Sequence, residues 1–383
     1  MRQTFPKTIT SDAFVAGNTL RAKGRDLPLK MGDRLVYHRG WLIEVDLDPT
    51  FTTNPGIVGH NNALSKINWK WGGQERYSLS GNGARMFERH EQGKHSAAEA
   101  IQTTSTNNRY FARYIPNGPR NFACPDDFDT CAGNLGDAEL EVKLGALLDI
   151  SADTTAAGGT VRLTAILTLA DDIHIAPWFE RREETAGSGV TLEGECLLAE
   201  VFLCNSTTYD AIAAADFSGV KLETGLMNVP DGEDAELLTR KYQQEWAVGQ
   251  LDSIQGEPRD ATFDVNQRQV NLVTPTAIAV QSADLQTVLS YNPGQKITGL
   301  MAYVRKNFKV SWTGANGAAT VRLVGRFLPL EDEAVGKMAE EASRVCGVTV
   351  ITDSARVKTV SRGNPGPMSR FMRRTVKVVR KAA

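Results

Sequence analysis

The acidic clusters are the side chains of this 383-residue chain best suited to binding a metal. Asp126, Asp127, Asp129 and Asp137 lie close together in the sequence, and carboxylate oxygens are the ligands that Ca²⁺ prefers. Their spacing lacks the central glycine and the final glutamate of a calcium loop. These residues could therefore bind calcium, and the alternative is that they form a polar turn. No cofactor is expected.

Two pairs of neighbouring carboxylates, Asp171-Asp172 and Glu183-Glu184, are of the type that a glycosidase uses as general acid and base. A solvated turn explains both pairs equally well. The chain contains no phosphate-binding glycine loop, no dinucleotide fingerprint, no His-Glu-x-x-His and no Gly-x-Ser-x-Gly motif. We therefore predict no catalytic residues and expect that the protein is not an enzyme.

Cysteine and histidine follow no metal-binding pattern. Six residues separate Cys124 from Cys131, more than the usual two to four of a zinc site, and no histidine pair follows them. We interpret the five histidines as surface or ordinary structural residues: His38, His60, His90, His95 and His174. The odd total of five cysteines also argues against a disulfide scaffold.

Three tryptophans lie where aromatic stacking would be useful. Trp69 and Trp71 share one side of a predicted strand, because side chains alternate between the faces of a sheet. We expect them in a hydrophobic core, and stacking on a sugar is the alternative. Trp178 follows Pro177 at the end of a predicted strand, where we expect it to seal the junction between two halves of the chain.

The charge of the chain is unevenly distributed. The net charge is −2, but nine Lys and Arg with no Asp or Glu follow residue 353, which leaves 34 basic and 45 acidic residues, or −11, before that point. Apolar residues of the tail recur at helical spacing, at Met368, Phe371, Met372, Val376 and Val379. Basic residues fall between them, at Arg370, Arg373, Arg374, Lys377, Arg380 and Lys381. The tail is thus predicted to be a basic amphipathic helix that meets an anionic lipid surface, nucleic-acid phosphates or a neighbouring subunit.

The elements that must position these residues are mostly strands. Short β-rich runs separated by turn residues cover 34–47, 161–169, 196–204, 277–280, 297–304 and 320–328. Helices are predicted over 83–101, from Asp231, over 331–345 and after Pro367. Without regular alternation of strand and helix, an antiparallel sandwich is favoured over a parallel sheet. No apolar run is long enough to span a bilayer and no secretory signal opens the chain, so we expect synthesis in a cytoplasm.

An internal repeat divides the chain. Residues 16–19 (AGNT) and 186–189 (AGSG) each lead into a strand, and 67–78 (INWKWGGQERYS) shares its strand–turn–strand–helix layout with 220–229 (VKLETGLMNV) and the segment after it. Residues 158–163 (GGTVRL) match 318–323 (AATVRL). The offsets of 170, about 153 and 160 residues are similar, which predicts two tandem copies of one β-rich domain.

This layout resembles that of the double jelly-roll major capsid proteins of membrane-containing bacteriophages, with the corticovirus type most similar. The resemblance is carried by AGNT at 16–19, INWKWGGQERYS with its helix, APWFERR at 176–182 and GAATVRLVGRFL at 317–328. It covers roughly residues 8–330, and the tail departs from it. The resemblance implies jelly rolls at 1–178 and 179–330, followed by a helical, basic extension at 331–383.

The same resemblance implies a structural function. Three copies would form a homotrimer that assembles with neighbouring capsomers into an icosahedral shell around an internal membrane, with the tail against lipid. Minor capsid proteins are further partners, nucleic acid is a less favoured one, and the location is the virion after synthesis in the host cytoplasm. The alternatives are a carbohydrate-binding or carbohydrate-active β-sandwich and a minor capsid or spike protein.

Overall fold

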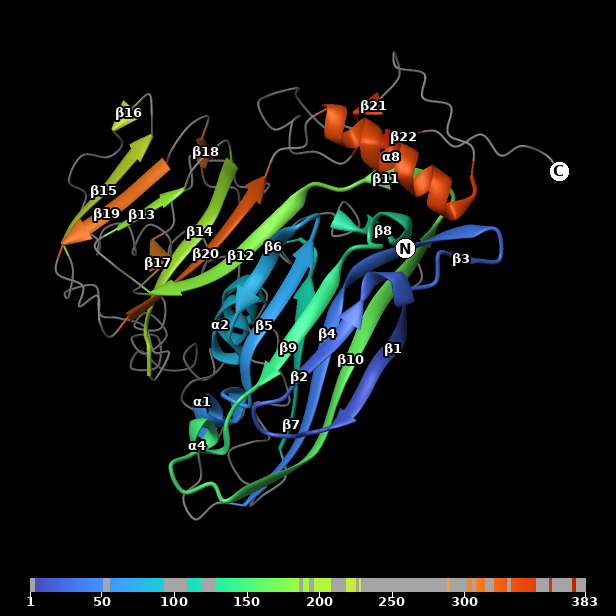
Figure 1. Ribbon diagram of the computed structural model, residues 1–383. Coiled ribbons are helices and arrows are strands. Elements are labelled where there is room, and N and C mark those ends of the chain that lie inside the picture. The colour runs from blue at the N-terminus through green and yellow to red at the C-terminus, as the bar shows by residue number, and fades with distance from the viewer. Residues whose placement is uncertain are drawn as a thin grey trace, which may run out of the picture.

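The computed structural model describes residues 4–50, 56–92, 109–118 and 128–185, and then 189–192, 196–207, 218–224, 227–228, 288–289, 302–304, 308–313, 320–328, 332–348, 358–359 and 374–376. Strands dominate these residues (Figure 1). In the first half they are β1 (Thr4–Ala13), β2 (Thr19–Lys23), β3 (Lys30–Met31), β4 (Arg34–Thr50), β5 (Leu64–Trp71), β6 (Gln74–Leu79), β7 (Arg109–Pro116), β8 (Thr130–Cys131), β9 (Glu139–Leu144) and β10 (Ala156–Ala170). Short helices interrupt them at η1 (Gly24–Asp26), α1 (Gly56–Asn61), α2 (Gly81–Gln92), η3 (Ala132–Asn134) and α4 (Leu147–Ile150).

The first half forms a sandwich of two antiparallel sheets. One sheet pairs β1 with β10, β10 with β4 and β4 with β7, and the facing sheet has the order β2-β9-β5-β6. The alternation in β10 explains the packing, because Val161, Leu163, Ala165 and Leu167 are fully buried while Arg162 between them is exposed. This order of strands is that of a jelly roll.

The second half repeats the same order of pairing. After the short strand β11 (Ile173–Ile175), its strands are β12 (Trp178–Thr185), β13 (Gly189–Leu192), β14 (Cys196–Asn205), β15 (Ser218–Thr224), β16 (Met227–Asn228), β17 (Val288–Leu289), β18 (Ala302–Val304), β19 (Phe308–Thr313) and β20 (Thr320–Leu328). One sheet runs β12-β20-β14, with β17 and β18 on β14, and the other runs β13-β19-β15-β16. The predicted repeat and the predicted fold class, two tandem jelly rolls, are therefore confirmed.

The repeated hairpin shows the correspondence most directly. In the first half β5 and β6 pair around Gly72 and Gly73, which have φ of 60° and 70° and so occupy the left-handed region that glycine tolerates. In the second half β15 and β16 pair in the same way, with Thr224 opposite Met227. The helix α2 follows the first hairpin as predicted, although it begins at Gly81. The helix predicted from Asp231 and the strand predicted at 277–280 lie outside the described residues.

One continuous sheet joins the two jelly rolls. The first strand of the second roll, β12, pairs in parallel with β6, the last strand of a sheet of the first roll, with Arg181 opposite Tyr77 and Arg182 opposite Ser78. The resulting nine-stranded sheet contains the path β17-β14-β20-β12-β6-β5-β9-β2, and Figure 1 shows β12 lying along β6. The residue-level domain limits at 178 and 330 remain a prediction.

Helix α8 (Asp332–Cys346) follows β20 and confirms the helix predicted over 331–345. Its predicted apolar face, however, is shifted by about one residue. Val335, Ala339, Ala342 and Cys346 are buried, whereas Ala334 and Val345 are only partly so. The shift arises because α8 lies against β11 (Figure 1) and shares a buried apolar cluster with Tyr37 of the first jelly roll.

The tail differs from the predicted helix at the residues that the structure describes. Arg374–Val376 is a strand, β22, that pairs antiparallel with β11 and with β21 (Lys358–Thr359). A continuous helix is therefore wrong at Arg374 and Val376, because the backbone groups of Ile173–Ile175 supply hydrogen-bond partners that favour an extended chain there. In the part of the chain that the structure describes, no helix is long and apolar enough to cross a membrane.

Candidate functional site

The tryptophans of the first jelly roll belong to its core. Trp69 and Trp71 are only 5% and 8% exposed and belong to the main hydrophobic core cluster, which confirms the core prediction. Trp69 packs edge-on against Trp41 at 5.4 Å between ring centres, and the indole nitrogen of Trp71 donates to the carbonyl of Asn134 at 2.8 Å.

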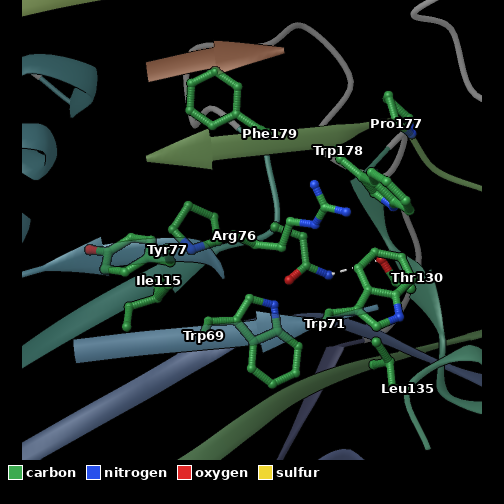
Figure 2. Close-up of a pocket in the computed structure, with 12 residues that line it drawn as sticks. Trp69, Trp71, Arg76, Tyr77, Ile115, Thr130, Leu135, Pro177, Trp178 and Phe179 are labelled. Carbon is green, nitrogen blue, oxygen red and sulfur yellow. Dashed lines mark hydrogen bonds between the residues drawn. The ribbon is translucent and has the colours of Figure 1, made fainter. Parts of the chain in front are cut away.

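Trp178 lies at the junction between the two jelly rolls, as predicted. It does not end the preceding strand but begins β12. Its ring packs edge-on against Trp71 at 5.3 Å, and the guanidinium carbon of Arg76 in β6 lies 3.6 Å from the ring centre, so a cation–π contact joins β6 to β12. Figure 2 shows the guanidinium of Arg76 pointing toward Trp178.

A buried carboxylate organises the charges around this contact. Glu180, 3% exposed, accepts hydrogen bonds from Arg182 on its own strand and from Arg326 on β20. Arg76 lies in the field of the same carboxylate, while burial lowers the pKa of its guanidinium to about 10. Glu180 thus balances several cations in the centre of the joined sheet.

Arg181, on the face of β12 opposite to Glu180, forms hydrogen bonds with the first jelly roll. Its side chain is 1% exposed, and its guanidinium donates to the carbonyl of Pro116 at 3.2 Å and to that of Gly118 at 3.0 Å. The guanidinium carbon also lies 4.4 Å from the ring centre of Phe179. Because both acceptors are main-chain carbonyls at the end of β7, the contact fixes the position of the backbone and not only of side chains.

Two of the carboxylates considered as acid and base, Glu183 and Asp171, have structural partners. Glu183 accepts hydrogen bonds from the backbone N–H and the hydroxyl of Ser80, both at 2.7 Å, at the start of α2. A carboxylate is favourable there because the N-terminus of a helix carries partial positive charge. Asp171 is exposed and pairs with Arg34 at 3.2 Å, and the carbonyl of Asp172 accepts from the hydroxyl of Tyr37.

The described members of the proposed calcium cluster also bind protein donors. Asp129 is fully buried and accepts from Arg39 at 3.0 Å and from Thr168 at 3.0 Å, and Asp137 accepts from the backbone of Gly72. Asp126 and Asp127 lie outside the described residues. Among the described residues no group of three or more His, Cys, Asp or Glu could hold a metal ion.

Three of the five histidines are buried structural residues, in agreement with the prediction. His38 packs against Trp41 and Trp69, and burial lowers its pKa to about 3. His174 stacks on Tyr37 at 4.2 Å, and His60 is 1% exposed. His95 and the side chain of His90 lie outside the described residues.

A small pocket opens at the junction (Figure 2). Its wall includes Trp69, Trp71, Trp178 and Arg76. Within the described part of the chain, Nε and Nη1 of Arg76 and the indole nitrogen of Trp178 are buried donors without an acceptor. Water or another small acceptor fits such a site. The pocket thus offers hydrogen-bond donors on an aromatic wall.

Sequence reasoning missed the central role of Arg76, Glu180 and Arg181. The signal available was the run FERREE at 179–184, because five charged residues inside a predicted strand need partners when that strand is central. Of the predicted tail residues, Arg374 and Val376 lie in β22. The others lie outside the described residues: Arg370, Phe371, Met372, Arg373, Lys377, Val379, Arg380 and Lys381.

Comparison with known proteins identifies similarity at the level of fold. No protein-family model and no curated protein sequence matches the chain. Among solved structures, the chain is similar to the MCP of Sulfolobus turreted icosahedral virus (STIV), with a TM-score of 0.51, 12% identity and coverage of 85% of this chain and 97% of that chain. Two further similar structures have lower scores. One is the PBCV-1 virus capsid, with a TM-score of 0.49, 8% identity and coverage of 85% of this chain and 94% of that chain. The other is the major capsid protein P2 of bacteriophage PM2, with a TM-score of 0.39, 10% identity and coverage of 85% of this chain and 97% of that chain.

Proposed function

We propose that this chain is a viral major capsid protein that acts by self-assembly into an icosahedral shell around an internal lipid membrane. The double jelly-roll fold and its similarity to the STIV MCP over 85% of this chain and 97% of that chain support this proposal. In this function no residue of the chain performs catalysis, and Glu180, Glu183 and Asp129 have structural roles.

The observation that carries the proposal is the pairing of β6 with β12. Because one sheet crosses from the first jelly roll to the second, the two rolls form one unit and need no flexible linker to keep their orientation. Three such units around a threefold axis would place six similar rolls in a ring. We therefore propose a homotrimer with a nearly hexagonal outline, which suits closed symmetric packing with neighbouring capsomers.

The basic tail is the part proposed to contact the membrane. Nine basic residues without an acidic residue follow a body of charge −11, so the tail is the region most strongly attracted to anionic headgroups. The protein would accordingly be located in the virion after synthesis in the host cytoplasm. Minor capsid proteins would be additional partners.

The test is the assembly state of the purified protein. Size-exclusion chromatography with light scattering is expected to show a particle three times the 41.7 kDa mass of the chain, and electron microscopy is expected to show a hexagonal outline. A stable monomer would contradict the proposal. Saturable binding of glycans by that monomer would instead support a carbohydrate-binding sandwich.

A further inference from the structure

Two buried cysteines meet where α8 closes on the first jelly roll. Cys131 ends β8 and is 0% exposed, and Cys346 is the last residue of α8 and is 4% exposed. Both are free, both belong to one buried apolar cluster, and each thiol shifts the pKa of the other. The fold therefore brings together two thiols that are far apart in the sequence.

The backbone around the pair is closely packed. Gly133 follows Cys131 in η3, and a Cβ atom at Gly133 would lie 2.7 Å from the Sγ of Cys346 and 3.3 Å from the Cα of Ala342. Residue Gly133 of η3 therefore lies directly against the Cys346 side chain and the backbone of α8. The two cysteines also share one apolar cluster with Tyr37 and Ile173.

The two thiols differ in acidity. The hydrogen bond from Cys131 and the charge of Lys30, whose amine donates to the carbonyl of Gly347 at 3.5 Å, lower the pKa of Cys346. The same hydrogen bond and the deeper burial of Cys131 raise its pKa. Cys346 is therefore the thiol that ionises first, and the thiolate is the form that attacks a disulfide.

We propose that Cys131 and Cys346 form a redox-active dithiol that is oxidised to a disulfide by a low-molecular-weight disulfide such as oxidised glutathione. The Cys346 thiolate attacks one sulfur of the small disulfide, forms a mixed disulfide and releases one small thiolate. Cys131 then gives its proton to the small thiolate released in the first step and attacks the Cys346 sulfur, and the second small thiolate leaves and takes up a proton from water. The protein dithiol loses two electrons, the small disulfide gains them, and the new bond links α8 to the first jelly roll.

The site would respond to the redox state of the surroundings. In a reducing cytoplasm the pair stays as thiols, and in an oxidising medium it becomes a covalent link. The link closes a long loop of the chain, which removes conformational freedom mainly from the unfolded state. The oxidised protein is therefore expected to have a higher midpoint of thermal unfolding than the reduced protein.

The experiment exposes the folded full chain to glutathione buffers of graded oxidised-to-reduced ratio, followed by acid quenching, alkylation, proteolysis and mass spectrometry. A peptide pair that joins Cys131 to Cys346 is expected, together with the higher unfolding midpoint. In Cys131→Ser the mixed disulfide on Cys346 should persist, because no second thiol displaces it. In Cys346→Ser, Cys131 should remain unmodified. Cys124→Ser is the matched control and should leave the link unchanged.

Two results would overturn the proposal. One is free thiols at both positions after exposure of the wild-type protein to the most oxidised buffer, with an unchanged circular dichroism spectrum. The other is a link from Cys346 to Cys124, Cys196 or Cys204 in place of Cys131. Because the wild-type result decides both points, a variant that fails to fold does not weaken the test.

Discussion

The guanidinium carbon of Arg76 lies 3.6 Å from the centre of the Trp178 ring, across the boundary between the two jelly rolls. Arg76 belongs to the last strand of one sheet of the first roll, and Trp178 begins the first strand of the second. Next to this contact β6 and β12 share backbone hydrogen bonds. The two rolls are thus joined by main chain and side chains together.

Trp178→Leu tests the contribution of that aromatic contact. The substitution removes the cation–π contact with Arg76 and the edge-on contact with Trp71. We expect the free energy of unfolding in urea to fall by about 2–3 kcal/mol, less than for a fully buried tryptophan because Trp178 is only partly buried. Leu148→Ala, at a side chain that is 69% exposed, is the control and should change stability little. Equal effects of the two variants would show that the contact does not stabilise the junction.

Glu180→Gln tests the buried charge network. The neutral amide leaves Arg326 and the nearby Arg76 without their common anion in a buried environment, and it also removes the partner of the more exposed Arg182. We expect a loss of about 3–5 kcal/mol in unfolding free energy, since removal of one partner from a buried ion pair exposes the full desolvation cost of the other.

The matched control for the buried network is Glu333→Gln. Glu333 pairs with Lys337 on the exposed side of α8, and we expect this variant to unfold at the wild-type urea concentration. A Glu180→Gln protein as stable as wild type would mean that Glu180 is not needed to balance the arginines.

His38 is expected to make the protein sensitive to mild acid. Burial lowers its pKa to about 3 in the folded state, from about 6.5 in the unfolded chain. Between pH 3 and pH 6.5 the unfolded state binds one more proton at His38 than the folded state does. The contribution of His38 to the free energy of unfolding is therefore fully present above about pH 6.5 and decreases as the pH falls. The slope from this group approaches about 1.4 kcal/mol per pH unit.

The measurement compares wild type with His38→Gln in urea unfolding from pH 7 to pH 4. The variant lacks the titrating ring, and its unfolding free energy should therefore decrease less steeply over this range. Carboxylates titrate in both proteins and cancel in the comparison. Parallel curves for the two proteins would contradict the role assigned to His38.

The tail is best tested by removal of charge rather than by deletion. Deletion of residues 354–383 would also remove β22, which pairs with β11 next to the first jelly roll. The triple variant Lys377→Gln, Arg380→Gln, Lys381→Gln keeps this strand. We expect it to bind phosphatidylglycerol vesicles more weakly by on the order of 100-fold, at about 1 kcal/mol for each basic residue, with an unchanged thermal midpoint.

The control for the tail variant is Lys7→Gln with Arg25→Gln and Lys66→Gln, at positions in the body of the protein, which should leave vesicle binding unchanged. Unchanged binding of the tail variant would remove the lipid proposal. Weaker binding of DNA with unchanged vesicle binding would instead assign the tail to nucleic acid.

Much of the fold could be predicted because local patterns report burial. Alternation in residues 161–169 identified a strand with one buried face, and the Gly72-Gly73 pair identified a hairpin turn. The repeated order of these patterns predicted two similar domains, since each jelly roll needs the same strands in the same order. The face of α8 was predicted less accurately, because its burial depends on how the helix lies against β11.

By itself, the sequence determined the strands, the duplication and the division of charge between the body and the tail. The tertiary structure alone decided the parallel pairing of β6 with β12, the contact of Arg76 with Trp178 and the meeting of Cys131 with Cys346. The physical reason is that periodicity along a strand or helix reports which face is buried but not which distant segment covers it. That choice depends on packing between elements that are far apart in the chain, and it also made Arg374–Val376 a strand.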